Sequence, residues 1–304
     1  RGPVGCWRDL QLAGGGRAVE SRGRSRIGTQ MVDGTVEVDG RRVHYVASGA
    51  RESPTLLMIH GGGAHTGWWH LLTPLLEAEW CTVALDLSGH GGDSERRPEY
   101  VLDGWCREVV AVAEAIGDRA VVLVGHSMGG GVALATAALE PSLASGVALI
   151  DSAVWAPYLS RFEGKGPPTI YPTREAAIDA FRLMPPQPVT NRAAELTLAP
   201  MSIAPRDGGW TWKWDPTALV SFDGTAVHEL LPRMECPVIE IAGELSDHVG
   251  PDAMELISER TGQEVPLIEI AGAYHHVMLD KPREVADALV PYLRQWTGVT
   301  ARPA

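Results

Sequence analysis

The chain has 304 residues, of which 45% are hydrophobic and 21% charged, and its formal net charge is −12 at pH 7. This composition allows a large buried core and argues against wholesale disorder. The negative charge disfavours binding to nucleic acid or to an anionic membrane surface, so neither is expected as a partner.

Residues 1–30 differ from the rest of the chain in charge and in pattern. They hold six Arg against Asp9 and Glu20, include Gly14-Gly15-Gly16, and show almost no apolar periodicity. They also lack the continuous apolar stretch of a secretory signal. We expect a disordered extension here, with an amphipathic, Arg-rich targeting peptide as the alternative.

The cysteines are few and widely separated. The four are Cys6, Cys81, Cys106 and Cys236, and no two of them form a CxxC pair. This spacing indicates neither a disulfide framework nor a zinc site, so a cytoplasmic location is expected. No apolar run approaches the roughly 18 residues that a membrane span needs.

Short apolar runs alternate with helical stretches from residue 36 onward. Asp39-Gly40 is a hairpin signal between strands at 36–38 and 43–46. The next expected elements are a strand at 55–59, a helix at 68–79, a strand at 81–85, a helix at 102–116, a strand at 121–124 and a helix at 127–139. Strands at 147–150, 238–242 and 265–270 and helices at 251–260 and 282–296 complete the pattern.

Several of these strands are apolar on both sides, which is typical of strands covered by helices on both faces. The order predicts an α/β fold with a mostly parallel, doubly wound sheet of eight strands, built from residues 31–152 and 226–300. Residues 153–225 interrupt the pattern with many Pro and aromatic residues, and about 70 residues is too long for a plain loop. We expect a helical cap there, or alternatively a peripheral, partly ordered excursion.

The segment Gly125-His126-Ser127-Met128-Gly129 lies between an apolar strand and a helix. This G-x-S-x-G arrangement needs small residues on either side of the serine, because strand and helix approach closely at the turn. The strained turn exposes the serine hydroxyl, and the helix N-terminus favours negative charge that develops beside it. Ser127 is therefore the candidate nucleophile.

A serine nucleophile needs a base and an acid that orients the base, each placed after another strand. His275 and His276 follow the strand expected at 265–270, and both are candidate bases. Asp247, in the loop after the strand at 238–242, is the first choice for the acid. Asp151, directly after the strand at 147–150, and Glu244 are the alternatives.

The loop His60-Gly61-Gly62-Gly63 follows the strand at 55–59 and predicts an oxyanion hole. Its N–H groups are uncovered by side chains, so Gly62 is the first choice and Gly63 the second, with Met128 as the other donor. The side chain of His60 is expected to have a structural role.

No phosphate-binding motif follows the glycines, and the scattered His and Asp residues show no zinc-site spacing. No cofactor and no metal are therefore expected.

With these motifs in place, the chain resembles the capped serine hydrolases of the α/β-hydrolase superfamily over residues 36–296. The resemblance rests on Gly125–Gly129, on Asp86-Leu87-Ser88-Gly89-His90-Gly91 and on the late His275, which stands five residues before Asp280 and seven before a Pro. Two positions depart from the family pattern, Ser88 where Arg is usual and Tyr274 where Gly is usual. The resemblance implies a triad of Ser127, His275 and Asp247.

A serine at this position implies hydrolysis of an ester, lactone or thioester through an acyl-enzyme. Cleavage of a C–C bond next to a carbonyl, and a slow ligand-binding receptor of the same fold, are the alternatives. We expect a small-molecule, hydrophobic ester as substrate; the sequence does not fix its identity or the oligomeric state. The candidate pocket residues are Trp68, Trp69, Trp155 and Trp212.

Overall fold

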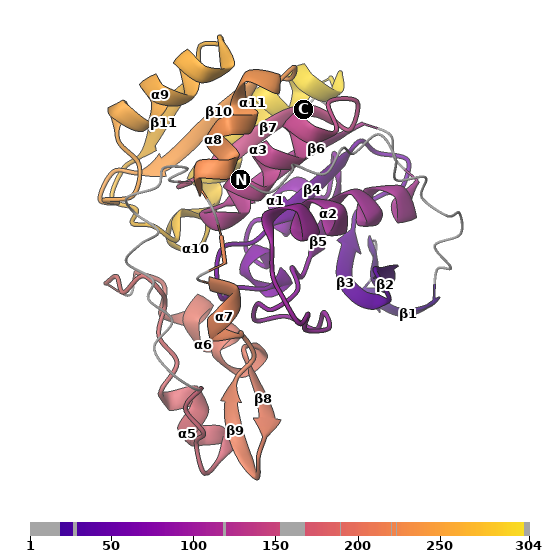
Figure 1. The fold of residues 1–304 in the computed structure, drawn as a ribbon, viewed down its shortest axis with the longest axis vertical. Coiled ribbons are helices and arrows are strands. Elements are labelled where there is room, and N and C mark those ends of the chain that lie inside the picture. Colours follow the sequence, from indigo (N-terminus) through magenta and orange to yellow (C-terminus); the bar gives the residue numbers. More distant parts are fainter. Residues whose placement is uncertain are drawn as a thin grey trace, which may run out of the picture.

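A computed structural model describes residues 19–26, 29–117, 120–152, 168–188, 190–219, 221–222 and 224–300. Nine strands form one sheet in the order β1-β2-β3-β5-β4-β6-β7-β10-β11 (Figure 1). The strands are β1 (Val19–Arg26), β2 (Thr29–Val38), β3 (Arg41–Ser48), β4 (Thr55–Ile59), β5 (Cys81–Leu85), β6 (Val121–His126), β7 (Ala144–Ile150), β10 (Val238–Gly243) and β11 (Leu267–Ile270). Every neighbouring pair from β5 to β11 is parallel, which confirms the predicted mostly parallel sheet.

The first strand of this sheet lies in a segment that we expected to be disordered. β1 pairs antiparallel with β2 and adds a ninth strand at the edge, next to the antiparallel β2 and β3. Residues 1–18 lie outside the described residues. The structure therefore describes a strand at residues 19–26, within the segment for which we expected disorder.

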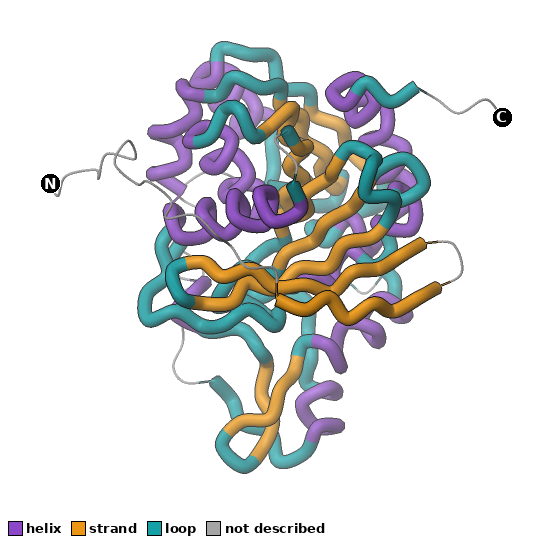
Figure 2. The backbone as a smooth tube through the Cα atoms, turned by 90° about the vertical axis from the view of Figure 1, so that its right-hand side faces the viewer, coloured by secondary structure: helices purple, strands orange, loops and turns teal. Residues whose placement is uncertain are grey.

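Helices cover both faces of the sheet, as the apolar strands predict (Figure 2). Side chains of β4 alternate between two cores, with Leu57 and Ile59 in one and Leu56 and Met58 in the other. The first core is covered by α2 (Leu102–Ile116), α3 (Met128–Leu139), α8 (Gly224–Leu230), η3 (Leu231–Arg233) and α9 (Pro251–Thr261). The second is covered by η2 (Thr66–Trp69), α1 (Thr73–Leu76), α10 (Val277–Asp280) and α11 (Pro282–Thr297).

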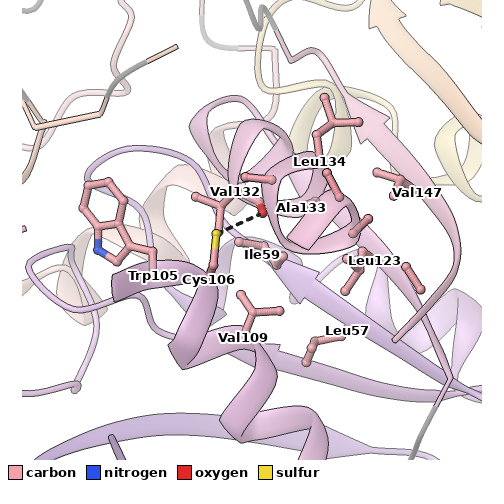
Figure 3. Packing of buried hydrophobic residues seen from close by; sticks show 14 of the residues in the cluster. Leu57, Ile59, Trp105, Cys106, Val109, Leu123, Val132, Ala133, Leu134 and Val147 are labelled. Atoms are coloured by element: carbon pink, nitrogen blue, oxygen red, sulfur yellow. Dashed lines mark hydrogen bonds between the residues drawn. The ribbon is translucent and has the colours of Figure 1, made fainter. Parts of the chain in front are cut away.

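The core between α2 and α3 holds the helix that follows Ser127 against the sheet. Figure 3 shows Cys106 and Val109 of α2 close to Val132 of α3 and to Leu57 and Ile59 of β4. All five side chains are almost completely buried. Complete burial stabilises an apolar side chain by about 1.5–3 kcal/mol. Because such cores are closely packed, the start of α3 is held rigidly against the sheet.

The helix expected at 68–79 is instead two short helical segments, η2 and α1. Pro74 lies at the start of α1 and has no N–H to donate to the preceding turn, which favours a break in the helix at this point. None of the described helices combines the length and the apolar character that a bilayer span requires.

The segment inserted between β7 and α8 projects from the sheet (Figure 1). It contains α5 (Arg174–Asp179), α6 (Arg192–Met201), β8 (Ile203–Arg206), β9 (Gly209–Trp212) and α7 (Pro216–Leu219). The β8–β9 hairpin was not expected, although Asp207-Gly208 is a turn signal and both residues adopt positive φ, 50° and 78°. Residues 153–167, where the predicted cap begins, lie outside the described part of the chain.

A buried charge pair joins β3 to the loop after β5. His44 Nδ1 lies 2.7 Å from Asp86 Oδ2, and His44 Nε2 lies 3.0 Å from Asp33 Oδ1. Burial alone would lower the pKa of His44, but the hydrogen bond and charge of Asp86, with Asp33, raise it to about 9. Asp86 also accepts hydrogen bonds from the backbone N–H groups of Thr66 and Asp93, so the pair anchors loops on both sides of it.

The raised pKa of His44 predicts a loss of stability at alkaline pH. The stabilisation is complete below pH 6.5, the ordinary pKa of His, and is lost as pH rises through about 9. Between these values the free energy of unfolding should fall by on the order of 2 kcal/mol. Urea unfolding at pH 6.5, 8 and 9.5 measures this, and His44→Asn should flatten the dependence. An equally steep fall in that variant would contradict the assignment.

Candidate active site

Ser127 lies in the tight turn between β6 and α3 with φ 53° and ψ −124°. A positive φ is strained for a non-glycine residue, and such strain is typical of functional positions. A Cβ at Gly125 would lie 2.5 Å from the Gly129 carbonyl oxygen, and a Cβ at Gly129 would overlap the carbonyl oxygens of Ile59 and His60. The two glycines are therefore required for the approach that presents Ser127.

The glycine loop after β4 lies directly against the serine. A Cβ at Gly61 would lie 3.0 Å from Ser127 Cβ. The N–H of Gly63 donates to His90 Nδ1 at 3.0 Å, so this second candidate donor is already used. Among the described residues, none accepts a hydrogen bond from the Gly62 N–H. Met128 is the first residue of α3, where N–H groups have no partner within the helix.

The side chain of His60 holds this loop in place. Its Nδ1 lies 2.8 Å from the Gly61 carbonyl oxygen, and its Nε2 accepts a hydrogen bond from the Leu87 N–H at 3.0 Å. His60 is fully buried, and burial lowers its pKa, so the ring is neutral. Both ring nitrogens are used in this way, which leaves His60 no free nitrogen for proton transfer.

The carboxylate that contacts His275 is Asp151 and not Asp247. His275 Nδ1 lies 2.6 Å from Asp151 Oδ2, and both side chains are buried. The side chain of Asp247 is 80% exposed and lies 2.9 Å from His248 Nδ1. The expected contact between Asp247 and His275 is therefore absent, and the alternative acid takes its place.

The backbone explains why Asp151 reaches His275 across β10, which lies between β7 and β11. A Cβ at Gly243, the last residue of β10, would lie 2.5 Å from the carbonyl oxygens of Ala273 and Tyr274. This glycine therefore lets the loop that carries His275 pass over the end of β10. Asp151 has φ 45° directly after β7 and is fixed by Ser246 Oγ at 2.6 Å and by the Gly243 N–H at 3.3 Å.

His275 is held against His126, the residue before Ser127, as a neutral imidazole. Its Nδ1 donates to Asp151, which leaves the Nε2 lone pair free. The ring centroid lies 4.8 Å from that of His126, the residue before Ser127, and His126 Nε2 donates to the His275 carbonyl at 3.1 Å. Burial, and then the neighbouring His248, lower the pKa of His275 well below its ordinary value.

The protonation states suit a general base at neutral pH. Burial raises the pKa of Asp151 to about 6, although the Ser246 hydrogen bond opposes the shift. At pH 7 the carboxylate is thus ionised and the imidazole of His275 is neutral, the form that accepts a proton. The other two candidates make different contacts. Glu244 accepts a hydrogen bond from the Gly272 N–H at the surface, and the buried ring of His276 interacts with the backbone carbonyl of Met184.

Three further side chains support the site and were missed in the sequence. Ser152 Oγ donates to the Ser127 carbonyl at 2.6 Å, and its N–H donates to Glu240 Oε1 at 3.1 Å. Glu240 is fully buried in β10, and burial, followed by the charge of Asp151, raises its pKa well above the ordinary value. The ring of His248 stacks on His275 with centroids 3.9 Å apart. Of the three, only Glu240 could have been noticed in the sequence, because a charged residue is unusual within an apolar run such as 238–242.

Aromatic rings connect the glycine loop to the inserted segment. Trp68, Phe181, Trp212 and Trp214 follow one another with centroid separations of 6.2, 6.0 and 6.4 Å. The ring of Trp214 would lie 3.8 Å from a Cβ at Gly63, so this row of rings ends over the glycine loop. Of the predicted pocket residues, Trp68 and Trp212 belong to the row. Trp69 is buried in the second core, and Trp155 lies outside the described residues.

Comparison with known proteins gives one family. A family model described as "Alpha/beta hydrolase family" matches residues 56–288. A "Dihydrolipoyllysine-residue acetyltransferase component of acetoin cleaving system" from Cupriavidus necator is 42% identical over 116 residues, 38% of this chain and 30% of the relative. "Protein phosphatase methylesterase 1" from Mus musculus is 39% identical over 127 residues, 38% of this chain and 33% of the relative.

A longer but weaker match is the "Serine hydrolase-like protein" of Danio rerio, 25% identical over 268 residues, 79% of this chain and 81% of the relative. The chain spans about a third of the length of the acetyltransferase components that it matches. Among solved structures, an "E-2-(Acetamidomethylene)succinate Hydrolase" has a TM-score of 0.74 at 21% identity, and the match covers 86% of this chain and 99% of that one.

Proposed function

Because this chain belongs to the alpha/beta hydrolase family, we propose that it is a serine hydrolase that cleaves a carboxylic ester, or a related lactone or thioester. The observation that carries the proposal is the 2.6 Å contact between His275 Nδ1 and Asp151 Oδ2, beside a serine held at positive φ. A nucleophile, a base and an orienting acid are the groups that acyl transfer to water requires. The 39% sequence identity over 127 residues with a protein named as a methylesterase supports an ester as the substrate.

In the proposed reaction, Ser127 Oγ attacks the carbonyl carbon while His275 Nε2 takes the hydroxyl proton. The N–H groups of Gly62 and Met128 stabilise the oxyanion, each with about 2.7–4 kcal/mol. The C–O bond then breaks, and the imidazolium gives its proton to the leaving alcohol. Water attacks the acyl-enzyme by the same steps in reverse, and Asp151 stabilises the imidazolium in both halves.

The inserted segment would cover the site as a cap and supply an apolar wall. It is tied to loops of the sheet by the Asp215 N–H, which donates to the Gly89 carbonyl at 2.7 Å, and by Lys213 Nζ, 2.7 Å from Asp93 Oδ1. The row of rings from Trp68 to Trp214 ends over the glycine loop. Such a wall favours a small, hydrophobic acyl or alcohol group, because aromatic surfaces bind apolar groups with large buried area.

Covalent labelling tests the proposed function. We expect diethyl p-nitrophenyl phosphate to release one equivalent of p-nitrophenol and to leave one diethylphosphoryl group on the peptide that contains Ser127. The protein should also hydrolyse p-nitrophenyl butyrate catalytically. A receptor of the same fold would bind without turnover, and a C–C hydrolase would be labelled but show little esterase activity. An unlabelled Ser127 together with no p-nitrophenol release would refute the proposal.

The pH dependence of the reaction follows from Asp151. Its pKa is raised to about 6, and the carboxylate must be ionised to stabilise the imidazolium. We therefore expect kcat/KM to be constant from pH 7 to 8.5 and to fall about tenfold per pH unit well below pH 6. Initial rates with p-nitrophenyl butyrate, corrected for the pH-dependent absorbance of p-nitrophenol, measure this profile. Full activity at pH 4.5 would contradict the assignment.

A further inference from the structure

Three buried imidazoles lie together beside Ser127. The ring centroids of His126, His275 and His276 are separated by 4.8, 5.5 and 5.0 Å, which forms a compact triangle. One ring nitrogen of each lies within 4.8 Å of one ring nitrogen of each of the others. All three side chains are at least 96% buried. We call these three residues the histidine triangle.

The hydrogen bonds of the triangle leave a lone pair free on each ring. His126 Nε2 donates to the His275 carbonyl, so the lone pair is on Nδ1, and this nitrogen has no partner among the described residues. His275 Nδ1 donates to Asp151, so its lone pair is on Nε2. The backbone carbonyl of Met184 interacts with one ring nitrogen of His276, and the other nitrogen has no hydrogen-bond partner in the described part of the chain. Unpartnered buried polar nitrogens are rare in native proteins, and a buried water, an ion or a catalytic role is the usual explanation.

From this geometry we infer that the histidine triangle binds a divalent transition-metal ion, of which Zn²⁺ is the type case, and that the bound ion inhibits the enzyme. Neutral imidazole is a preferred ligand of Zn²⁺. Three imidazoles leave one tetrahedral position for water or for Ser127 Oγ. The site differs from the catalytic metal sites of hydrolases, because catalysis by the proposed triad needs no metal.

Inhibition follows from competition for one lone pair. The proposed mechanism, on which this part of the inference rests, uses His275 Nε2 to take the proton of Ser127. A bound ion occupies that lone pair, so the base is removed while the fold is unchanged. The metal and the hydroxyl proton of Ser127 therefore compete for the same nitrogen.

A second group of possible ligands, Asp151, His248 and His275, also lies within 4.8 Å. Its atoms are already used, since Asp151 Oδ2 accepts from His275 Nδ1 and from Ser246 Oγ, and His248 Nδ1 contacts Asp247. An ion there would have to break these contacts. Each ring of the histidine triangle keeps one nitrogen outside these hydrogen bonds, and this difference favours the triangle.

Metal binding is tested first without the reaction. Ser127→Ala, purified without an oligohistidine tag, is titrated with Co²⁺ and then with Zn²⁺ at pH 7.5. We expect one Co²⁺ per chain, a visible absorption band of four-coordinate Co²⁺, and loss of the band when Zn²⁺ displaces it. In the same background His276→Gln should weaken binding at least about tenfold, and His248→Gln should not. Absence of Co²⁺ and Zn²⁺ uptake by Ser127→Ala would overturn the inference, whether or not the variants of His276 fold.

Activity is tested second, with the chain that carries Ser127. Zn²⁺ should lower the kcat for hydrolysis of p-nitrophenyl butyrate, because the bound ion removes the base, and EDTA should restore the full rate. His276→Gln should raise the inhibition constant at least about tenfold relative to its own uninhibited rate, and His248→Gln should leave it unchanged. The reverse ranking would place the ion at the second group and overturn the inference. If metal binds Ser127→Ala but the wild type hydrolyses no ester, the site stands and the proposed function fails.

Discussion

Asp151→Asn is expected to lower kcat about 10⁴-fold, whereas Asp247→Asn should change it by less than about fivefold. The amide introduced by Asp151→Asn retains the size of the carboxylate but cannot stabilise the imidazolium, and it can stabilise the wrong tautomer of His275. The side chain of Asp247 is 80% exposed and lies 2.9 Å from His248 Nδ1, so its charge is screened by water. Steady-state rates with p-nitrophenyl butyrate compare the two variants.

The two aspartates are a matched pair, because both follow neighbouring strands of the sheet and both are changed in the same way. Circular dichroism and thermal unfolding establish that each variant is folded. A large loss with Asp247→Asn and little with Asp151→Asn would return the acid role to the residue favoured by the sequence pattern. If both substitutions lower kcat only slightly, neither aspartate acts as an orienting acid in the mechanism.

Ser127→Ala is expected to lower kcat/KM more than about 10³-fold for p-nitrophenyl acetate and butyrate. The variant retains the N–H groups of Gly62 and Met128, so a residual rate above that in water should remain. Alanine also carries a Cβ, so the strain at φ 53° and the approach of β6 and α3 should both be unchanged. Stopped assays with high protein concentration measure the residual rate.

Ser145→Ala is the control for this substitution. Ser145 is in β7, and its hydroxyl donates to the Val121 carbonyl at 3.2 Å, at the opposite end of β6 from Ser127. It should lose less than about 0.5–1.5 kcal/mol of stability and keep its activity. Equal p-nitrophenol release by wild type and Ser127→Ala would mean that another group is the nucleophile.

The sheet could be predicted because its strands are strongly apolar and its turns carry clear glycine signals. The segment Val121–His126 followed by Ser127 locates the strand, the turn and the helix with little ambiguity. Weaker elements were missed. β1 consists mainly of polar residues and pairs only along one edge, and β8 and β9 are four residues each, so neither shows the pattern of a buried strand.

The acid could not be chosen from the sequence, because spacing does not show the direction of a side chain. Asp151 and Asp247 both follow parallel strands and reach the same edge of the sheet. The outcome depends on the φ of 45° at Asp151 and on the absence of a Cβ at Gly243, which are properties of the folded backbone. His248, Ser152 and Glu240 were missed for a similar reason, since each acts through contacts with residues distant in the sequence.

The hydrogen bond from Ser152 Oγ to the Ser127 carbonyl has a consequence for engineering. A Cβ at Gly130 would overlap Ser152 Oγ, so residues 130 and 152 share one small volume. Alanine at position 130 should therefore be recovered from a mutant library only together with glycine at position 152. Libraries that randomise the two codons jointly will reach active enzymes that one-codon scans discard, and natural variation at the two positions should be correlated.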